Sequence, residues 1–244
     1  MKQRLIASGL HFLASAAVIS VFIMLVYFIW YVYPYNIVYS ALDVIKIVVG
    51  VDLVLGPLLT LVIYNVAKPR TELARDVSII ICFQLVALFW GVYNTYVVRP
   101  VFAVYYDGTI YTVTPRDVDL SQLNSSLSAP GILGSATLVY AEDVKNWEEI
   151  VTIYEKITDG GKGIMYSTGR YLPVTGHEEE ILKQNMGHDY INKVIDKQVL
   201  DRFIQHHGKE LSEFIYYPLV SGIQGGEGVF VLDKQSMEVV DVFK

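Results

Sequence analysis

Three long apolar runs near the start of the chain constrain its fold more than any other feature. Leu5–Tyr33 and Val77–Val98 contain no Asp, Glu, Lys or Arg. Ile47–Val66 contains a single charged residue, Asp52. A helix rises 1.5 Å per residue, and about 20 residues cross the hydrocarbon core of a bilayer. We therefore expect a bundle of three transmembrane helices within residues 1–99.

The first run also has features of a signal peptide, because Lys2 and Arg4 precede it. The apolar part of a signal peptide is only about 7–15 residues long and ends at a polar cleavage zone. Here the run continues through Phe22 and Trp30. Its length favours an uncleaved membrane anchor.

The short loops predict the orientation of the bundle. Basic residues near the membrane collect on the cytoplasmic side. Five lie on one side of the expected bundle and two on the other: Lys2, Arg4, Lys68, Arg70 and Arg75 against Lys46 and Arg99. The N-terminus is therefore expected in the cytoplasm, and residues 100–244 on the far side. Aromatic residues gather where the interfaces would lie: Tyr27, Trp30, Tyr31, Tyr33 and Tyr35, then Trp90, Tyr93 and Tyr96.

Charge separates the two parts of the chain. Residues 1–99 carry a net charge of +3, whereas the remainder carries −9, within a total of −6. The acidic second part argues against a nucleic-acid partner. Cys82 is the only cysteine, so the chain forms no intramolecular disulfide.

One face of the second expected helix carries Asp52, Gly56 and Thr60, which are spaced four residues apart. Pro57 follows Gly56 and removes one backbone hydrogen bond, so a kink is expected there. Small residues let helix backbones approach closely, and polar side chains bond across the contact. We expect this face to meet a matching face of the third helix: Gln84, Ala87, Gly91 and Asn94.

Counting from the outer ends of the two runs places Asp52 opposite Asn94 and Gly56 opposite Gly91. Arg99, or Lys46, is then available to neutralise the Asp52 carboxylate. Ionisable residues inside a membrane are functional candidates. Asp52 is either a structural staple between two helices or a contact with a substrate or partner, and the sequence leaves both open.

Transport is not expected, because a proton or ion path needs further ionisable groups across the bilayer. The other candidate, His11, sits near the cytoplasmic end of the first run. Counting along the helices separates it from Asp52.

The second part is predicted to be a small periplasmic α+β domain with antiparallel strands, covering residues 100–244. Asp107–Gly108 joins two alternating segments and suits a hairpin turn. Further strands are expected in "GSATLVYAED", "EFIYYPLV" and "GVFVLDKQSMEVVDVF", the last forming two strands joined at Asp233–Lys234. Helices are expected at Trp147–Ile157, His177–Met186 and Lys193–His206, and loops at Gly131–Gly134 and Ile223–Gly228.

Candidate chemical groups in this part are few. "ITDGGKGIM" around Lys162 lacks phosphate-loop spacing. "HEEE" from His177 lacks the second histidine of a zinc helix and reads as an acidic first helical turn. His206–His207 resembles an exposed helix end, and one residue of each pair Tyr105–Tyr106 and Tyr216–Tyr217 is open to exposure. We expect no catalytic, metal-binding or cofactor-binding residues, and therefore no enzyme.

Several stretches resemble a known family. "GVDLVLGPLLTLVIYN" in the second run, the short basic loop, "QLVALFWGVY" in the third run and "RPVFAVY" after it are similar to the type IV pilin accessory proteins of the TfpX/TfpZ group. The resemblance covers roughly residues 1–110. It implies a multi-pass protein of the Gram-negative inner membrane that acts without catalysis in pilin handling, pilus assembly or pilus dynamics.

The resemblance implies two kinds of partner: type IV pilin with other pilus-assembly proteins, and the lipid bilayer. Two alternatives remain. A membrane-anchored periplasmic sensor would need a separate signalling partner, because the cytoplasmic side has only the N-terminus and one short loop. A membrane-tethered enzyme would need a convergent set of acid, base or nucleophile, which the sequence does not offer.

Overall fold

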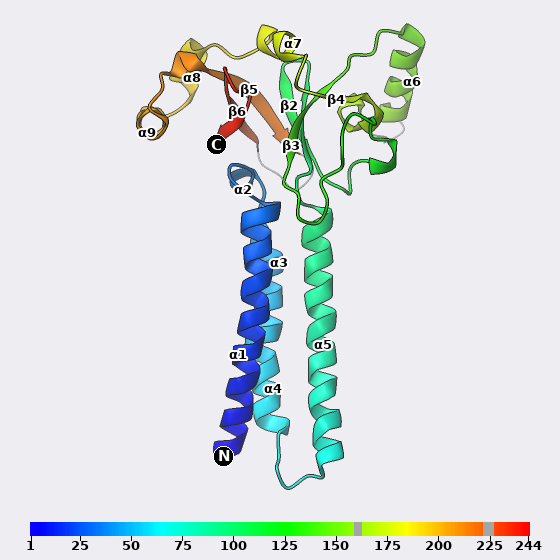
Figure 1. The fold of residues 1–244 in the computed structure, drawn as a ribbon, viewed down its shortest axis with the longest axis vertical. Coiled ribbons are helices and arrows are strands. Elements are labelled where there is room, and N and C mark those ends of the chain that lie inside the picture. Colours follow the sequence, from blue (N-terminus) through cyan, green and yellow to red (C-terminus); the bar gives the residue numbers. More distant parts are fainter. Residues whose placement is uncertain (159–162, 222–226) are drawn as a thin grey trace. The chain divides into compact units, whose positions relative to one another are not determined.

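The structure is a computed structural model that describes residues 1–158, 163–221 and 227–244 (Figure 1). The chain forms two compact units. The helical unit comprises Met1–Ile29 and Ser40–Val97. The sheet unit comprises Trp30–Tyr39 and Val98–Lys244.

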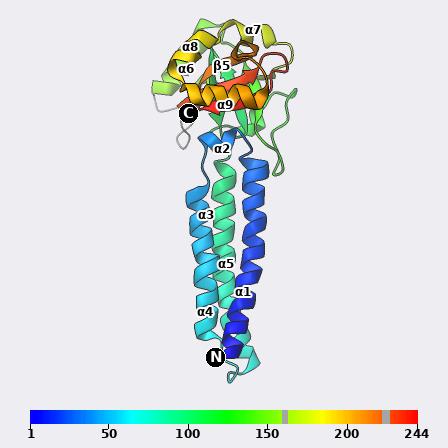
Figure 2. The same ribbon diagram turned by 90° about the vertical axis from the view of Figure 1, so that its left-hand side faces the viewer.

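Three continuous helices build the helical unit, and Figure 2 shows them side by side. The first joins α1 (Lys2–Leu25) to the π-helical turn η1 (Val26–Trp30). The second, called here the middle helix, joins α3 (Leu42–Val49), the π-helical segment η2 (Gly50–Leu55) and α4 (Gly56–Ile63). The third is α5 (Arg70–Val97). All three are long and apolar enough to cross a membrane, which confirms the expected apolar helices.

Two of these helices begin earlier than the apolar runs indicate. The middle helix starts at Leu42 rather than Ile47, with Asp43 and Lys46 forming an exposed ion pair at 3.1 Å within its first turns. α5 starts at Arg70, directly after Pro69, and carries Glu72 in its first turn. A proline before a helix and an acid in the first turn both favour initiation. Charges mark the edge of an apolar run, but not the end of a helix.

The helical unit is apolar outside and partly polar inside. α1 packs along η2 and α4, and α5 packs along α3, η2 and α4. Buried polar residues include Asp52, Thr60 and Gln84, whereas Phe28 and Phe83 are more than 70% exposed. Water disfavours a surface of this kind, and lipid favours it.

The sheet unit holds one seven-stranded mixed sheet in the order β4-β3-β1-β2-β5-β6-β7. Its strands are Phe102–Tyr106, Thr109–Val113, Thr137–Ala141, Tyr171–Pro173, Phe214–Ser221, Glu227–Asp233 and Val239–Phe243. The expected antiparallel pairings are present, and the sheet also contains two parallel pairings that were not expected, β1 with β3 and β2 with β5. Long connections precede β3 and β5, and such connections allow parallel crossovers that a short turn does not.

The predicted hairpin at Asp107–Gly108 is confirmed. β1 and β2 are antiparallel with Tyr106 opposite Thr109, and the two turn residues have φ angles of 45° and 71°. β6 and β7 are also antiparallel, although a loop over residues 234–238 joins them. The loop at Gly131–Gly134 is present, and residues 222–226 of the other expected loop lie outside the described residues.

Four α-helices accompany the sheet in the described part of this unit after β3: α6 (Trp147–Thr158), α7 (Glu178–Lys183), α8 (His188–Val194) and α9 (Lys197–His207). The helix expected from Lys193 begins at Lys197, because the Asp196 side chain accepts a hydrogen bond from the Gln198 amide and caps it. α8 was not expected. One core cluster joins α8 and α9 to β5, β6 and β7 through buried side chains that include Ile191, Leu200, Phe203, Tyr216 and Val231.

The segment after the first helix is part of the sheet unit. It contains α2 (Tyr35–Val38). Trp30 Nε1 donates to the Ile132 carbonyl at 2.6 Å, and the Tyr39 hydroxyl bonds to Thr112 Oγ1 at 2.7 Å. Packing within this unit thus buries Trp30 and Tyr39, and an interfacial location is not needed to explain their aromatic side chains.

Candidate functional site

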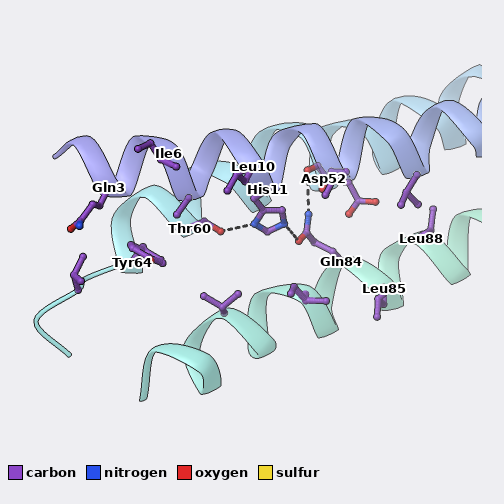
Figure 3. A pocket seen from close by; sticks show the side chains of 17 residues that line it. Gln3, Ile6, Leu10, His11, Asp52, Thr60, Tyr64, Gln84, Leu85 and Leu88 are labelled. Carbon is purple, nitrogen blue, oxygen red and sulfur yellow. Dashed lines mark hydrogen bonds between the residues drawn. The ribbon is translucent and has the colours of Figure 1, made fainter. Parts of the chain in front are cut away.

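A chain of polar side chains links all three helices of the helical unit (Figure 3). His11 of α1 lies between Thr60 of α4 and Gln84 of α5. Its Nδ1 is 2.6 Å from Thr60 Oγ1, and its Nε2 is 2.6 Å from Gln84 Oε1. Gln84 Nε2 donates to the backbone carbonyl oxygen of Asp52 at 3.2 Å. The network therefore runs from Thr60 through His11 and Gln84 to the backbone at Asp52.

The bonding partners assign the protons in this network. A carbonyl oxygen only accepts, so the nitrogen of the Gln84 amide faces Asp52 and its oxygen faces His11. His11 Nε2 then carries a hydrogen, and in the neutral ring Nδ1 accepts from the Thr60 hydroxyl. Every bond in the chain has a donor and an acceptor when His11 is neutral.

Asp52 lies in the middle of the 22-residue middle helix, not near its outer end as the start at Ile47 had indicated. Its side chain is buried, with 4% of the residue exposed. Its Oδ1 has no hydrogen-bond partner among the described residues. Gln84 also acts on the carboxyl group through a side-chain hydrogen bond, and His11 acts on it electrostatically when the ring is protonated. The 3.2 Å bond from Gln84 goes to a backbone oxygen, which any residue at this position supplies.

The backbone around Asp52 is π-helical. The Gly56 N–H bonds to the Val51 carbonyl, five residues back, and Pro57 follows with no N–H to donate. The helix absorbs the proline through this wider segment. Ser8 Oγ of α1 donates to the Pro57 carbonyl at 2.8 Å and fixes α1 against the same turn.

The middle helix and α5 do approach closely at Gly56 and Gly91, but each glycine faces a larger side chain of the other helix. A side-chain carbon added at Gly56 would meet the Gln84 amide, and one at Gly91 would meet Val48. Gly56 therefore does not face Gly91, and the contact is shifted by seven residues, about two helical turns. Most of the shift comes from the middle helix beginning at Leu42 rather than Ile47.

The other two predicted site residues, Asn94 and Arg99, have hydrogen-bond partners of their own. Asn94 is half-buried, and its side chain donates to the Trp90 carbonyl of its own helix at 2.8 Å. Arg99 belongs to the sheet unit, where its guanidinium donates to the carbonyls of Pro130 and Gly131 at 2.8 and 3.0 Å. An ion pair of Arg99 with Asp52 stays a prediction.

A cavity of about 650 Å³ lies between α1 and α5, with the polar network in its wall (Figure 3). α1 and α5 both pack on the middle helix, which forms the rest of the wall. The polar lining includes His11, Asp52, Thr60 and Gln84, and most of the other side chains are apolar. We call this cavity the α1/α5 groove.

His11 is the residue that sequence reasoning missed, because its depth was compared with Asp52 alone. Its distance from the end of its run that is expected in the cytoplasm matches that of two other polar residues. His11 lies six residues from Leu5, Thr60 six from Val66, and Gln84 seven from Val77. At 1.5 Å per residue all three lie about 9–10 Å from the ends of their runs. That shared distance is the signal that could have identified the network.

The candidate groups of the sheet unit have structural roles. Glu178–Glu180 form the first turn of α7, as expected. His207 is half-buried against the rings of Phe203 and Phe214, and burial lowers the pKa of its imidazole, whereas His206 is exposed as expected. Tyr216 and Tyr217 are both buried, since both faces of β5 are covered. Residues 159–162 of the glycine-rich stretch around Lys162 lie outside the described residues.

Comparison with known proteins finds relatives of one kind. The chain is 31% identical over 235 residues to the fimbrial assembly protein of serogroup I from Dichelobacter nodosus, which covers 93% of this chain and 90% of the relative. It is 36% identical over 120 residues to the serogroup E1 protein, covering 49% of this chain and 47% of that relative. It is 36% identical over 116 residues to the protein of serogroups C1 and C2, covering 48% of this chain and 88% of that relative. No family model matches the chain, and no solved structure does.

Proposed function

This chain belongs to the family of fimbrial assembly proteins, and on that premise we propose that it is an accessory factor for type IV pilus biogenesis that binds or stabilises pilin. The observation that carries the proposal is the alignment with a fimbrial assembly protein over 93% of the chain. The resemblance of residues 1–110 to the TfpX/TfpZ group supports the same assignment.

In this proposal the three apolar helices anchor the protein in the bacterial inner membrane. Their outward apolar side chains and buried polar ones suit lipid rather than water. The basic residues near the N-terminus and in the loop between α4 and α5 favour a cytoplasmic N-terminus. The sheet unit then faces the periplasm, where its acidic surface is available to a pilin head or to other assembly proteins.

The α1/α5 groove supplies a place for pilin. A pilin subunit carries an apolar N-terminal helix, which waits in the bilayer before assembly. Such a helix needs a partner with an apolar groove and small residues that allow close approach. The groove offers Ala7 and Ala14 on α1 and an apolar wall from α5. We propose that the pilin helix lies in it.

Crosslinking in native membranes tests this placement. Photoreactive residues replace Leu10 of α1 or Leu85 of α5, which line the groove. Leu13 is the matched control for Leu10, because it is 64% exposed against 63% and does not line the groove. The control on α5 is Phe89, which is exposed and does not line the groove.

Pilin is expected in adducts from Leu10 and Leu85, and not from Leu13 and Phe89. Equal capture from all four positions would indicate contact without a specific groove. If neither groove position captures pilin when both proteins are abundant, the proposed binding is wrong.

A further inference from the structure

We propose that the carboxyl group of Asp52 recognises the occupant of the α1/α5 groove, and that this occupant is an apolar helix which presents one hydrogen-bond donor to Asp52 halfway along its own membrane span. The inference rests on the proposed function, since it specifies how the pilin helix is recognised. It assigns Asp52 a partner outside its own chain.

Within the described part of the chain, the Oδ1 atom of Asp52 takes no part in holding the helices together. A staple needs a side-chain bond across a helix contact, and Oδ1 has none among the described residues. The bond that ties α5 to this turn uses the Asp52 backbone carbonyl and Gln84. The Gln84 oxygen is in turn bonded to His11. The bonds of Gln84 to the Asp52 backbone and to His11 therefore remain when the Asp52 side chain is replaced.

The position makes an unbonded carboxyl oxygen costly. Asp52 is at the centre of an apolar helix of 22 residues and is 4% exposed. Charged or unsatisfied polar groups are most unfavourable at this depth, and in membrane proteins they mark functional contacts. An occupant that donates a hydrogen bond to Oδ1 removes this cost. The free energy that is recovered contributes to the affinity of the groove for that occupant.

A helix fits this requirement, and a lipid acyl chain does not. The acyl part of a lipid has no donor at mid-depth, so it leaves Oδ1 unbonded. The α1 residues that line the groove lie on one face of the helix, at spacings of three and four residues from Gln3 to Val18. This face is about 22 Å long. Ala7, Ala14 and Ser15 lie on this face, and small residues of this kind let a second backbone approach.

The polar network positions the carboxyl. Gln84 fixes the backbone of Asp52, and His11 fixes Gln84 against Thr60. Ser8 holds the next turn through the Pro57 carbonyl. Asp52 thus stays in the groove wall whether or not the groove is filled, as a specific recognition group must.

The test uses the full-length protein with the photoreactive residue at Leu85. Asp52→Leu removes the carboxyl and keeps a side chain of similar size, and Asp52→Asn keeps one acceptor oxygen. Asp43→Asn is the control, because it removes an exposed acid of the same helix outside the groove. Two quantities are measured: the yield of the pilin adduct in native membranes, and the resistance of the purified protein to unfolding in detergent.

For Asp52→Leu, we expect the pilin adduct to fall by about three- to twentyfold, the range for one interhelical hydrogen bond. The purified variant should unfold no more easily than the wild type, because replacing an unsatisfied buried polar group by an apolar one of similar shape is neutral or stabilising. Asp52→Asn should lose less adduct than Asp52→Leu, and Asp43→Asn should lose none.

Three results would overturn the inference. An unchanged pilin adduct in Asp52→Leu would show that the carboxyl recognises nothing, while leaving the proposed function intact. A purified Asp52→Leu protein that unfolds more easily would make Asp52 a staple after all. A wild-type adduct with lipid or a second copy of this chain, and none with pilin, would refute both the occupant and the proposed function.

Discussion

Gly56→Ala adds one methyl group at a close contact between the middle helix and α5. The new carbon would meet the Gln84 amide, with Cδ at 2.7 Å and Oε1 at 3.0 Å. Moving Gln84 aside has a cost, because its oxygen is bonded to His11 and its nitrogen to the Asp52 carbonyl. The substitution therefore breaks or strains both bonds, and the three helices lose their polar link.

The expected magnitude follows from these two bonds. Hydrogen bonds between membrane helices contribute about 0.6 kcal/mol on average and up to about 1.7 kcal/mol. Loss of both costs about 1–3 kcal/mol. Alanine is itself a better helix former than glycine by up to about 1 kcal/mol, which offsets part of the loss. Gly50→Ala has the same intrinsic gain and no atom within 4 Å of the added carbon, so it is the matched control.

The assay is reversible unfolding of the purified protein from a mild into a denaturing detergent, followed by far-UV circular dichroism. Gly56→Ala should be less stable than Gly50→Ala by about 1–3 kcal/mol. In a Gln84→Ala background the clash is gone, so the same substitution should cost nothing. If Gly56→Ala matches Gly50→Ala, or costs as much without Gln84, the packing described here is refuted.

Two further predictions concern the sheet unit. Phe203→Ala empties a buried site among the aromatic rings of β5 and β7 and should lower the free energy of unfolding by about 3–5 kcal/mol. The control Gln205→Ala, at an exposed position, should lower it by less than about 0.5 kcal/mol. Equal effects of the two substitutions in a thermal scan would contradict the packing of Phe203 in this core. The Lys209 ammonium beside Asp233 lowers the pKa of that carboxyl to about 2, so its stabilisation is present above the ordinary aspartate pKa near 4 and is lost as the pH falls toward 2. Asp233→Asn should therefore reduce the acid-side fall in the thermal midpoint over this window, whereas Asp201→Asn, at an exposed position on α9, should preserve it; identical acid profiles for the wild type and Asp233→Asn would exclude this pairing.

Local patterns predicted the elements of this chain well. The three apolar helices follow from uninterrupted apolar length, and the β1–β2 hairpin from Asp107–Gly108, because both signals lie within neighbouring residues. The parallel pairings of β1 with β3 and β2 with β5 join segments far apart in the chain, and no local pattern encodes them.

The candidate site was predicted only in part, for a related reason. Asp52, Gly56, Thr60 and Gln84 do lie together, yet the register between helices depends on where each helix begins. Because Asp43 and Lys46 are charged, the middle helix was predicted to begin at Ile47, whereas it begins at Leu42, five residues earlier. His11 lies on α1 and bonds to both of the other helices. Comparing only the second and third apolar runs does not reveal its place in the network.

The account rests on three helices that span the membrane and leave the sheet unit outside the cytoplasm. A reporter enzyme that is active only in the periplasm, fused after Lys244, tests this directly, with a second fusion at Asn65 in the loop between α4 and α5. The account predicts activity from the fusion after Lys244 and none from the fusion at Asn65. A stably expressed fusion that is silent after Lys244, or active at Asn65, would contradict it.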